Sequence, residues 1–291
     1  MNNNILEVLK AKFGHEIVNT TVIEGRIVNS NLYNKKEFLT KAAHKQIENY
    51  VAGGIILPET HKKVLTKVDN NWGFDFPGWL GKISEGKKIM IIGQEPHIVE
   101  PPVQIVYGFS QNINESSQDT AERLINNNKL WFRITELFKH QFSSGHEVLE
   151  NCYITDICHF APSKCGTVGT IETKIFEHSQ KWKTIRDKIL SKHLEEEIHA
   201  LSPSVIICQS AIAYKSVVRI LSPQIKEPVK MKYPSKGYII KFANWKDKIN
   251  IIGMPHLGSS FNITDKFWDN YLPEVLGLIE RNMEINPINK P

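Results

Sequence analysis

The sequence contains few cysteines. Only four of its 291 residues are cysteine, and no two of them form a C-x-x-C pair. We therefore expect reduced thiols in a cytoplasmic protein rather than a disulfide framework or a zinc site. Three of the four, Cys152, Cys158 and Cys165, lie close together in the chain, so a metal cluster stays open as an alternative.

Membrane and export segments are also missing. No stretch of about eighteen or more apolar residues occurs, which excludes a spanning helix. The first residues, MNNNILEVLKAKFG, lack the basic and apolar layout of a secretory signal. The charge balance is a mild excess of base, +5 at neutral pH. This excess is compatible with a polyanionic partner such as DNA but does not require one.

Apolar runs and helical spacing alternate along most of the chain. The pattern predicts strands at Lys88–Ile92, Cys152–Ile157, Val205–Cys208 and Ile249–Ile252. It predicts helices over about 118–142, 176–200, 211–221 and 265–283, and residues 237–246 could add a strand or hairpin arm. Strands that alternate with helices favour an α/β fold with a parallel sheet covered on both faces.

The chain before the first strand has a different character. Residues 1–70 are polar, with helical spacing around Ile5–Phe13 and Glu37–Val51. We expect an N-terminal helical extension packed on a catalytic domain of residues 71–291, and a separate domain is the alternative. The segment WGFDFPGWL, residues 72–80, reads as a loop beside the first strand or as a stacking platform for bases.

Three residues with catalytic chemistry follow predicted strands. Glu95 comes after the first strand, Asp156 ends the second, and His256 follows the fourth. Each one alone is more often a capping or surface group. Because the carboxyl ends of parallel strands meet at one edge of a sheet, we expect the three side chains to converge on one cleft.

Four segments carry a resemblance to a known family. Residues Gly93–His97, GQEPH, resemble the GQDPY motif of uracil-DNA glycosylases, with Glu in place of Asp and His in place of Tyr. The segments Tyr107–Ser110, Tyr153–Asp156 and Pro255–Ser260 are similar to further motifs of that family, in the same order. The resemblance covers about residues 87–270. It implies a three-layer sandwich with a four-stranded parallel sheet between helices.

The resemblance also implies roles for individual residues. Glu95 would stabilise positive charge on the deoxyribose and position a water, while His256, helped by backbone N–H groups near Gln94, would stabilise the departing base. Phe109 would stack on the flipped base. No Lys lies within the motifs, so water is the expected nucleophile, with no cofactor or metal. The expected DNA contacts are Ser110, Gly258, Ser259, Ser260 and Phe261, the last either a wedge in the duplex or a core aromatic.

Two departures from the family concern the base that is read. Asp156 stands where the family has an Asn that reads uracil. A carboxylate accepts hydrogen bonds, so it suits the N4 amino group of cytosine better than the O4 of uracil. His97 replaces the Tyr that excludes a C5 substituent, and the smaller polar side chain could admit one.

These departures lead to a hypothesis about the substrate. We expect a monofunctional DNA glycosylase that removes a C5-modified cytosine, such as a hydroxymethylated or glucosylated base in phage DNA, in antiviral defence. An enzyme that removed plain cytosine would destroy its own genome. The alternatives are a uracil or deaminated-base glycosylase of base-excision repair and a DNA-binding module without catalysis. A nucleotide-binding enzyme is less favoured because no G-x-G-x-x-G or Walker loop is present. No obligate protein partner is inferred.

Overall fold

A computed structural model describes the parts of the chain that build the central sheet and several of its helices. It describes residues 4–27, 72–93, 104–105, 115–157, 160–162, 194–222, 229–232, 239–246, 248–257, 272–273 and 276–277. The helices are α1 (Ile5–Phe13), α2 (His15–Thr21), the 3-10 helix η2 (Ile83–Glu85), α5 (Ser117–Asn127), α6 (Lys129–Phe138), α7 (Gly145–Glu150), α10 (Leu194–Leu201) and α11 (Ala211–Leu221). The strands are β1 (Val22–Ile23), β2 (Arg26–Ile27), β3 (Trp72–Asp75), β4 (Gly78–Trp79), β5 (Ile89–Gly93), β6 (Gln104–Ile105), β7 (Cys152–Asp156), β8 (Phe160–Pro162), β9 (Val205–Cys208), β10 (Val229–Lys232), β11 (Ile239–Trp245) and β12 (Ile249–Gly253).

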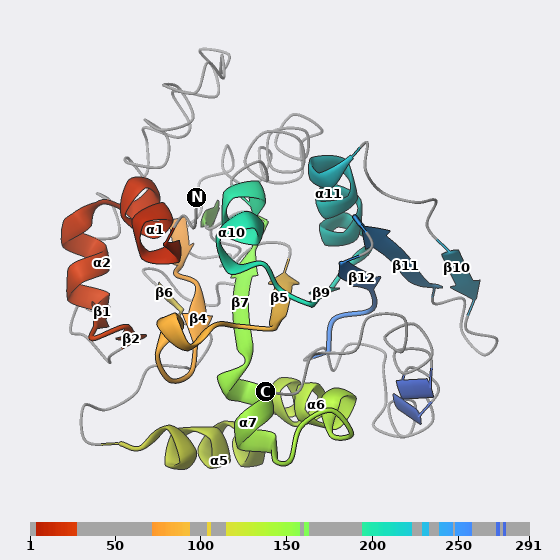
Figure 1. Cartoon of the computed structure of the whole chain (residues 1–291), viewed down its shortest axis with the longest axis horizontal. Helices are drawn as coiled ribbons and strands as arrows, with labels where there is room; N and C mark the ends of the chain where they lie inside the picture. Colours follow the sequence, from red (N-terminus) through yellow and green to blue (C-terminus); the bar gives the residue numbers. More distant parts are fainter. Residues whose placement is uncertain are drawn as a thin grey trace.

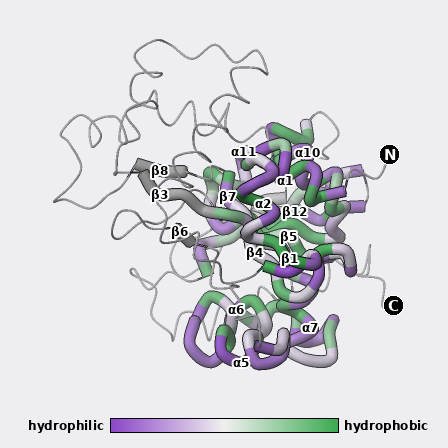
Figure 2. The backbone as a smooth tube through the Cα atoms, turned by 90° about the vertical axis from the view of Figure 1, so that its left-hand side faces the viewer, coloured by the Kyte–Doolittle hydropathy of each residue, from purple (hydrophilic) through white to green (hydrophobic). Residues whose placement is uncertain are grey.

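The main sheet has seven strands in the order β10-β11-β12-β9-β5-β7-β4. Its four central strands, β12, β9, β5 and β7, are parallel, and β4, β11 and β10 add antiparallel edges. Helices α1, α10 and α11 lie on one side of this sheet and α5–α7 on the other (Figures 1 and 2). The predicted α/β sandwich around four parallel strands is therefore confirmed, with an extra strand or more at each edge.

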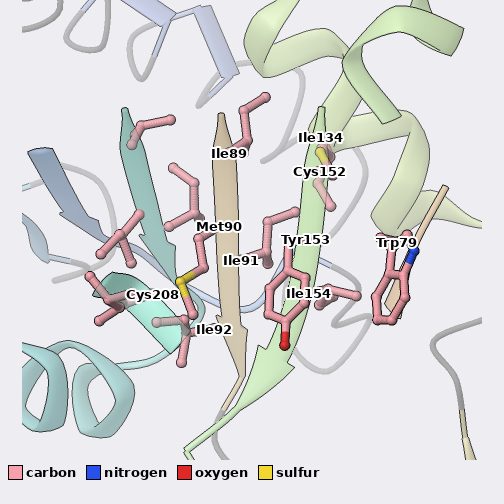
Figure 3. Packing of buried hydrophobic residues seen from close by; sticks show 14 of the residues in the cluster. Trp79, Ile89, Met90, Ile91, Ile92, Ile134, Cys152, Tyr153, Ile154 and Cys208 are labelled. Atoms are coloured by element: carbon pink, nitrogen blue, oxygen red, sulfur yellow. The ribbon is translucent and has the colours of Figure 1, made fainter. Parts of the chain in front are cut away.

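The strands at the centre of the sheet are buried along their whole length. Every residue of β5, β7, β9 and β12 is buried, which is typical of parallel strands covered on both faces. Figure 3 shows the apolar side chains of β5 and β7 packed beside Trp79 of β4. The Trp79 ring stacks on Tyr153 of β7, with centroids 6.0 Å apart. This uninterrupted apolar packing is what fixes the position of the strand ends.

A buried ionic network joins the N-terminal helices to the sheet. The Lys12 ammonium of α1 donates to the Glu197 carboxylate of α10, and the Tyr153 hydroxyl of β7 donates to the other carboxylate oxygen at 3.1 Å. All three residues are buried. Three elements that are far apart in the chain thus share one buried charge pair.

The rest of the N-terminal segment packs beside the first edge strand. The Phe13 ring lies 5.0 Å from that of Phe76, measured between centroids. The Trp79 indole N–H donates to the Gly25 carbonyl at 3.0 Å, and the same carbonyl accepts from the Ile83 N–H at 2.9 Å. Residues 4–27 therefore pack on the sheet, while residues 28–71 lie outside the described residues, and the extension over residues 1–70 stays a prediction.

Several predicted elements need correction. The helix expected over 118–142 is two helices, α5 and α6, because Asn128 has an extended backbone and its side chain accepts from the Leu130 N–H to start the second one. Ser116 caps α5, because its hydroxyl accepts from the Asp119 N–H. The segment 72–80 is not a loop, since β4 pairs with β7 and β3 pairs with β6 and β8.

Other elements were missed or fall outside the described residues. The sequence did not predict α2 or β10, whereas β11 matches the strand expected within 237–246. Of the helix expected over 176–200, the part described is α10. Of the C-terminal helix expected over 265–283, residues 272–273 and 276–277 are described, and they are helical. The second N-terminal helix, Glu37–Val51, lies outside the described residues.

Candidate active site

The carboxyl ends of the four parallel strands form one edge of the sheet. Gly93, the last residue of β5, pairs with Asp156, the last of β7. On the other side of β5, Ile92 pairs with Cys208, and Cys208 pairs in turn with Gly253 of β12. The four strands therefore end level with one another, and the segments that follow them start from a common line.

The hydrogen-bonded ladder continues one residue beyond β9 and β12. The Gln209 N–H donates to the Ile92 carbonyl at 2.8 Å, and the Met254 N–H donates to the Cys208 carbonyl at 3.0 Å. Within the strands, a residue donates in the same way to the residue that precedes its partner, as Val205 does to Lys88. Gln209 thus stands opposite Gly93, and Met254 stands opposite Gln209.

Asp156 occupies the β7 end of this line. Its side chain is only 1% exposed, and the preceding Thr155 is fully buried. The next residue, Ile157, donates its N–H to the Gly93 carbonyl at 3.1 Å, which holds the backbone on both sides of Asp156. A buried carboxyl group is costly unless it is hydrogen-bonded, so its position at this strand end calls for an explanation.

His256 lies on the segment that follows β12, and it is exposed. The residues around it are anchored, because Met254 and Leu257 are both buried. Arg133 of α6, 4% exposed, donates from its guanidinium to the Leu257 carbonyl at 2.5 Å. A buried cation from a helix thus fixes the backbone next to an exposed imidazole.

Helix α11 packs against the end of β12. A Cβ at Gly253 would lie 2.6 Å from Cδ2 of Tyr214, closer than real side-chain contacts allow. Glycine therefore lets the helix approach the strand at the point where the His256 segment begins. Burial raises the pKa of the neighbouring Cys208 thiol, which keeps it neutral and unsuited to act as a nucleophile.

The region that includes this sheet edge matches a known protein family. The family model of the Uracil DNA glycosylase superfamily matches residues 80–272, about two thirds of the chain. The chain belongs to the uracil DNA glycosylase superfamily. Members of this superfamily are typically DNA glycosylases, so DNA is the implied substrate. Among proteins with curated descriptions, none matches the chain.

The glycosylase region includes all the residues singled out from the sequence, but the structure describes only some of them. Asp156 ends β7 and His256 follows β12 at the same edge of the sheet, while the convergence of their side chains on one cleft stays a prediction. The others lie outside the described residues, and their roles stay predictions: Gln94, Glu95, His97, Phe109, Ser110, Gly258, Ser259, Ser260 and Phe261. Glu95 follows the last residue of β5 by two positions.

Two residues at this edge were not predicted from the glycosylase motifs. Gln209 directly follows the apolar strand β9, and the rule that singled out Glu95, a polar residue soon after a buried strand, would have found it. Arg133 lies 124 positions from Leu257 in a helix, so no local signal reveals its contact. The edge therefore holds more polar groups than the motifs indicate.

Neither a metal cluster nor a membrane-spanning helix is found among the described residues. Within the described ranges, no three His, Cys, Asp or Glu side chains gather closely enough to hold a metal ion. Cys152 and Cys208 are buried free thiols. None of the helices that the structure describes is long and apolar enough to cross a membrane.

Proposed function

We propose that the chain is a monofunctional DNA glycosylase that hydrolyses the N-glycosidic bond of a flipped, C5-modified cytosine and leaves an abasic site. The observation that carries the proposal is the buried carboxyl group of Asp156, at the end of β7, in a member of the uracil DNA glycosylase superfamily. The superfamily supplies the reaction class, and the carboxyl group supplies the choice of base.

The reaction needs charge stabilisation at two places. Water adds to C1′ of the deoxyribose, the C1′–N1 bond breaks, its electron pair leaves with the base, and the proton of the water ends on the base. Glu95 stabilises the positive sugar and orients the water, and His256 donates to O2 of the departing base. The anchoring of the His256 segment by Arg133 supports this role, because a donor must be fixed in place before the charge develops.

The choice of cytosine follows from hydrogen-bonding complementarity. Uracil offers an acceptor at O4 and a donor at N3, whereas cytosine offers an amino donor at N4 and an acceptor at N3. One oxygen of Asp156 accepts from the N4 amino group, and when the carboxyl group is protonated the other donates its proton to N3, which makes the base a better leaving group. The same carboxylate leaves uracil O4 without a donor, and an unsatisfied polar group in a buried site is costly.

The need for a modified base follows from self-protection. Plain cytosine is present throughout the DNA of the host, so an enzyme that removed it would destroy its own genome. A substituent at C5, as in hydroxymethylated or glucosylated cytosine of phage DNA, would distinguish the target. The smaller side chain at His97 supports this proposal, because the family's Tyr there excludes a C5 substituent.

The test is release of base from oligonucleotides that contain uracil, cytosine, 5-hydroxymethylcytosine or its glucosylated form. We expect release of a modified cytosine and intact plain cytosine. Asp156→Asn restores an amide that donates to O4, so it should raise the ratio of uracil to modified-cytosine release by about tenfold to a hundredfold. Glu95→Gln is the control, because it should abolish release of every base.

Three results would count against the proposal. Release of uracil alone by the unchanged protein would refute the cytosine assignment and favour base-excision repair. Tight DNA binding without release of any base would favour a binding module. Equal release by Glu95→Gln and by the unchanged protein would refute the role of Glu95.

A further inference from the structure

A second polar side chain lies at the same sheet edge as Asp156. Gln209 directly follows β9, is 2% exposed, and ends in a carboxamide oxygen that is buried. No partner for this oxygen lies within hydrogen-bonding distance among the described residues. Buried polar groups are nearly always satisfied, so this oxygen needs an explanation.

The strand register places Gln209 and Asp156 on the same face of the sheet. Gly93 is paired with Asp156 on one side, and the ladder continues to Gln209 on the other. Residues paired across neighbouring strands project to the same face, and side chains alternate along each strand. Tyr153 contacts Glu197 of α10, so Asp156, three positions later, projects to the opposite side. That is the side of α6, whose Arg133 holds the His256 segment.

Gly93 separates the two side chains and has none of its own. Strands lie about 4.8 Å apart, so two spacings put the backbones of Asp156 and Gln209 about 10 Å apart. Because both side chains project from the same face, their polar ends are about as far apart as the backbones. Hydrogen bonds of about 2.9 Å at each end then leave about 4 Å between the two ligand groups that they contact. This separation matches the exocyclic groups at C4 and C2 of a single pyrimidine ring and is too short for a bicyclic purine held edge to edge.

We propose that Gln209 is a second base-contacting residue that donates from its carboxamide to O2 of the flipped pyrimidine, across Gly93 from Asp156. The inference rests on the proposed glycosylase function and deepens it. A carboxamide can turn its donor toward the ring, because the oxygen and nitrogen exchange places by rotation. A carbonyl accepts two hydrogen bonds, so O2 can take one from Gln209 and one from His256. Both stabilise the negative charge that develops on the departing base.

The proposal makes opposite predictions for activity and for stability. Gln209→Leu removes the donor and replaces a buried amide, whose oxygen has no partner among the described residues, with an apolar side chain. We expect kcat/KM for release of 5-hydroxymethylcytosine to fall about tenfold to a hundredfold, while the melting temperature stays the same or rises. Gln209→Glu keeps the shape but places a carboxylate beside the developing charge, and it should lose at least as much activity. A residue with only a structural role would instead lose stability and activity together.

Gln141 offers a matched control. It follows α6, it is partly buried, and its carboxamide oxygen is likewise buried without a partner among the described residues. It lies on the connection to α7, which leads to the start of β7 and not to its carboxyl end. Gln141→Leu should therefore leave kcat/KM unchanged.

The experiment combines base release with binding of an oligonucleotide that carries a non-hydrolysable 2′-fluoro nucleotide of the same base. Weaker binding and slower release by both Gln209 variants, with no fall in the melting temperature of Gln209→Leu, support the proposal. Wild-type kcat/KM and binding in Gln209→Leu and Gln209→Glu overturn it, as does a loss of activity that only follows a loss of stability. If the unchanged protein releases no base, the glycosylase function fails, and the binding series alone decides whether Gln209 contacts the base.

Discussion

Replacing Glu197 with Gln should lower the free energy of unfolding by about 3–5 kcal/mol. Glu197 is fully buried, receives the Lys12 ammonium on one oxygen, and accepts from the Tyr153 hydroxyl on the other. Gln keeps one acceptor for the hydroxyl, but it removes the charge and replaces the oxygen that accepts from Lys12 with an NH2 donor. The loss therefore comes from a buried ammonium whose counter-charge is gone, and breaking a buried pair on one side carries this penalty.

The pH dependence of this loss has a definite sign. Burial already lowers the pKa of Lys12, and the Glu197 charge opposes that effect. Without the carboxylate the pKa falls further, so at alkaline pH the unfolded chain binds a proton that the folded protein does not. Stability of Glu197→Gln should then rise with pH relative to the unchanged protein, and the deficit should shrink between pH 7 and pH 9.

The assay is urea unfolding followed by circular dichroism and by tryptophan fluorescence. Lys12→Met should cost a similar amount, since it leaves the carboxylate uncompensated, whereas the double variant Lys12→Met/Glu197→Gln should cost much less than the sum. Single variants that each cost under about 1 kcal/mol, or a double variant that equals the sum, would refute the coupling. One transition common to both probes would indicate that the N-terminal helices unfold together with the rest of the chain. The division into an extension and a catalytic domain at residue 70 stays a prediction.

Variants of Lys87 and Arg133 test the two edges of the sheet. Burial lowers the pKa of Lys87 to about 8, so between about pH 8 and pH 10.5 the unfolded chain keeps a proton that the folded protein has lost. In urea unfolding between pH 7 and pH 10.5, the free energy of unfolding of the unchanged protein should therefore rise by about 3 kcal/mol relative to that of Lys87→Met. A difference that stays constant with pH would contradict this. Arg133→Gln should lower kcat of base release about tenfold to a hundredfold by freeing the Leu257 carbonyl. Arg133→Lys should restore part of the loss with little change in KM, and an equal loss in both variants would argue against positioning.

The parallel core could be predicted because its strands carry their own signal. A run such as Ile89–Ile92 has no polar face, and only a strand covered on both sides suits it. The edge strands carry no such signal. Gly78 and Trp79 form β4 only because β7 lies alongside, and the aromatic, Gly- and Pro-rich sequence around them looks like a loop until that partner is known. The break before α6 was missed because the helical spacing continues through Asn128, whose capping role appears only in the backbone.

The candidate site likewise has residues that the sequence predicts and residues that it does not. The positions of Asp156 and of the His256 segment could be predicted, because each comes at the end of an apolar run that reads as a strand. The positions of groups that act from elsewhere could not be predicted, because they depend on packing. Arg133 reads from the sequence as a surface cation on an amphipathic helix, yet it is buried against the backbone of a segment 124 residues away. Such contacts are fixed only when the helix layer docks on the sheet.

Buried polar groups are hydrogen-bonded at the amino edge of the sheet, whereas at the carboxyl edge one of them has no partner among the described residues. At the amino edge, the Lys87 ammonium donates to the carbonyls of Leu80 and Glu150, so the buried groups there satisfy one another. At the carboxyl edge, a glycine ends β5 and the buried oxygen of Gln209 has no partner in the described part of the chain. A protein selected for stability alone would fill that position with an apolar side chain, at no cost in hydrogen bonds. The retention of a buried amide across Gly93 from a buried carboxyl group is therefore best explained by a ligand that pairs with the carboxamide once it has turned its donor outward, and the flipped base is the ligand that the proposed reaction brings to this edge.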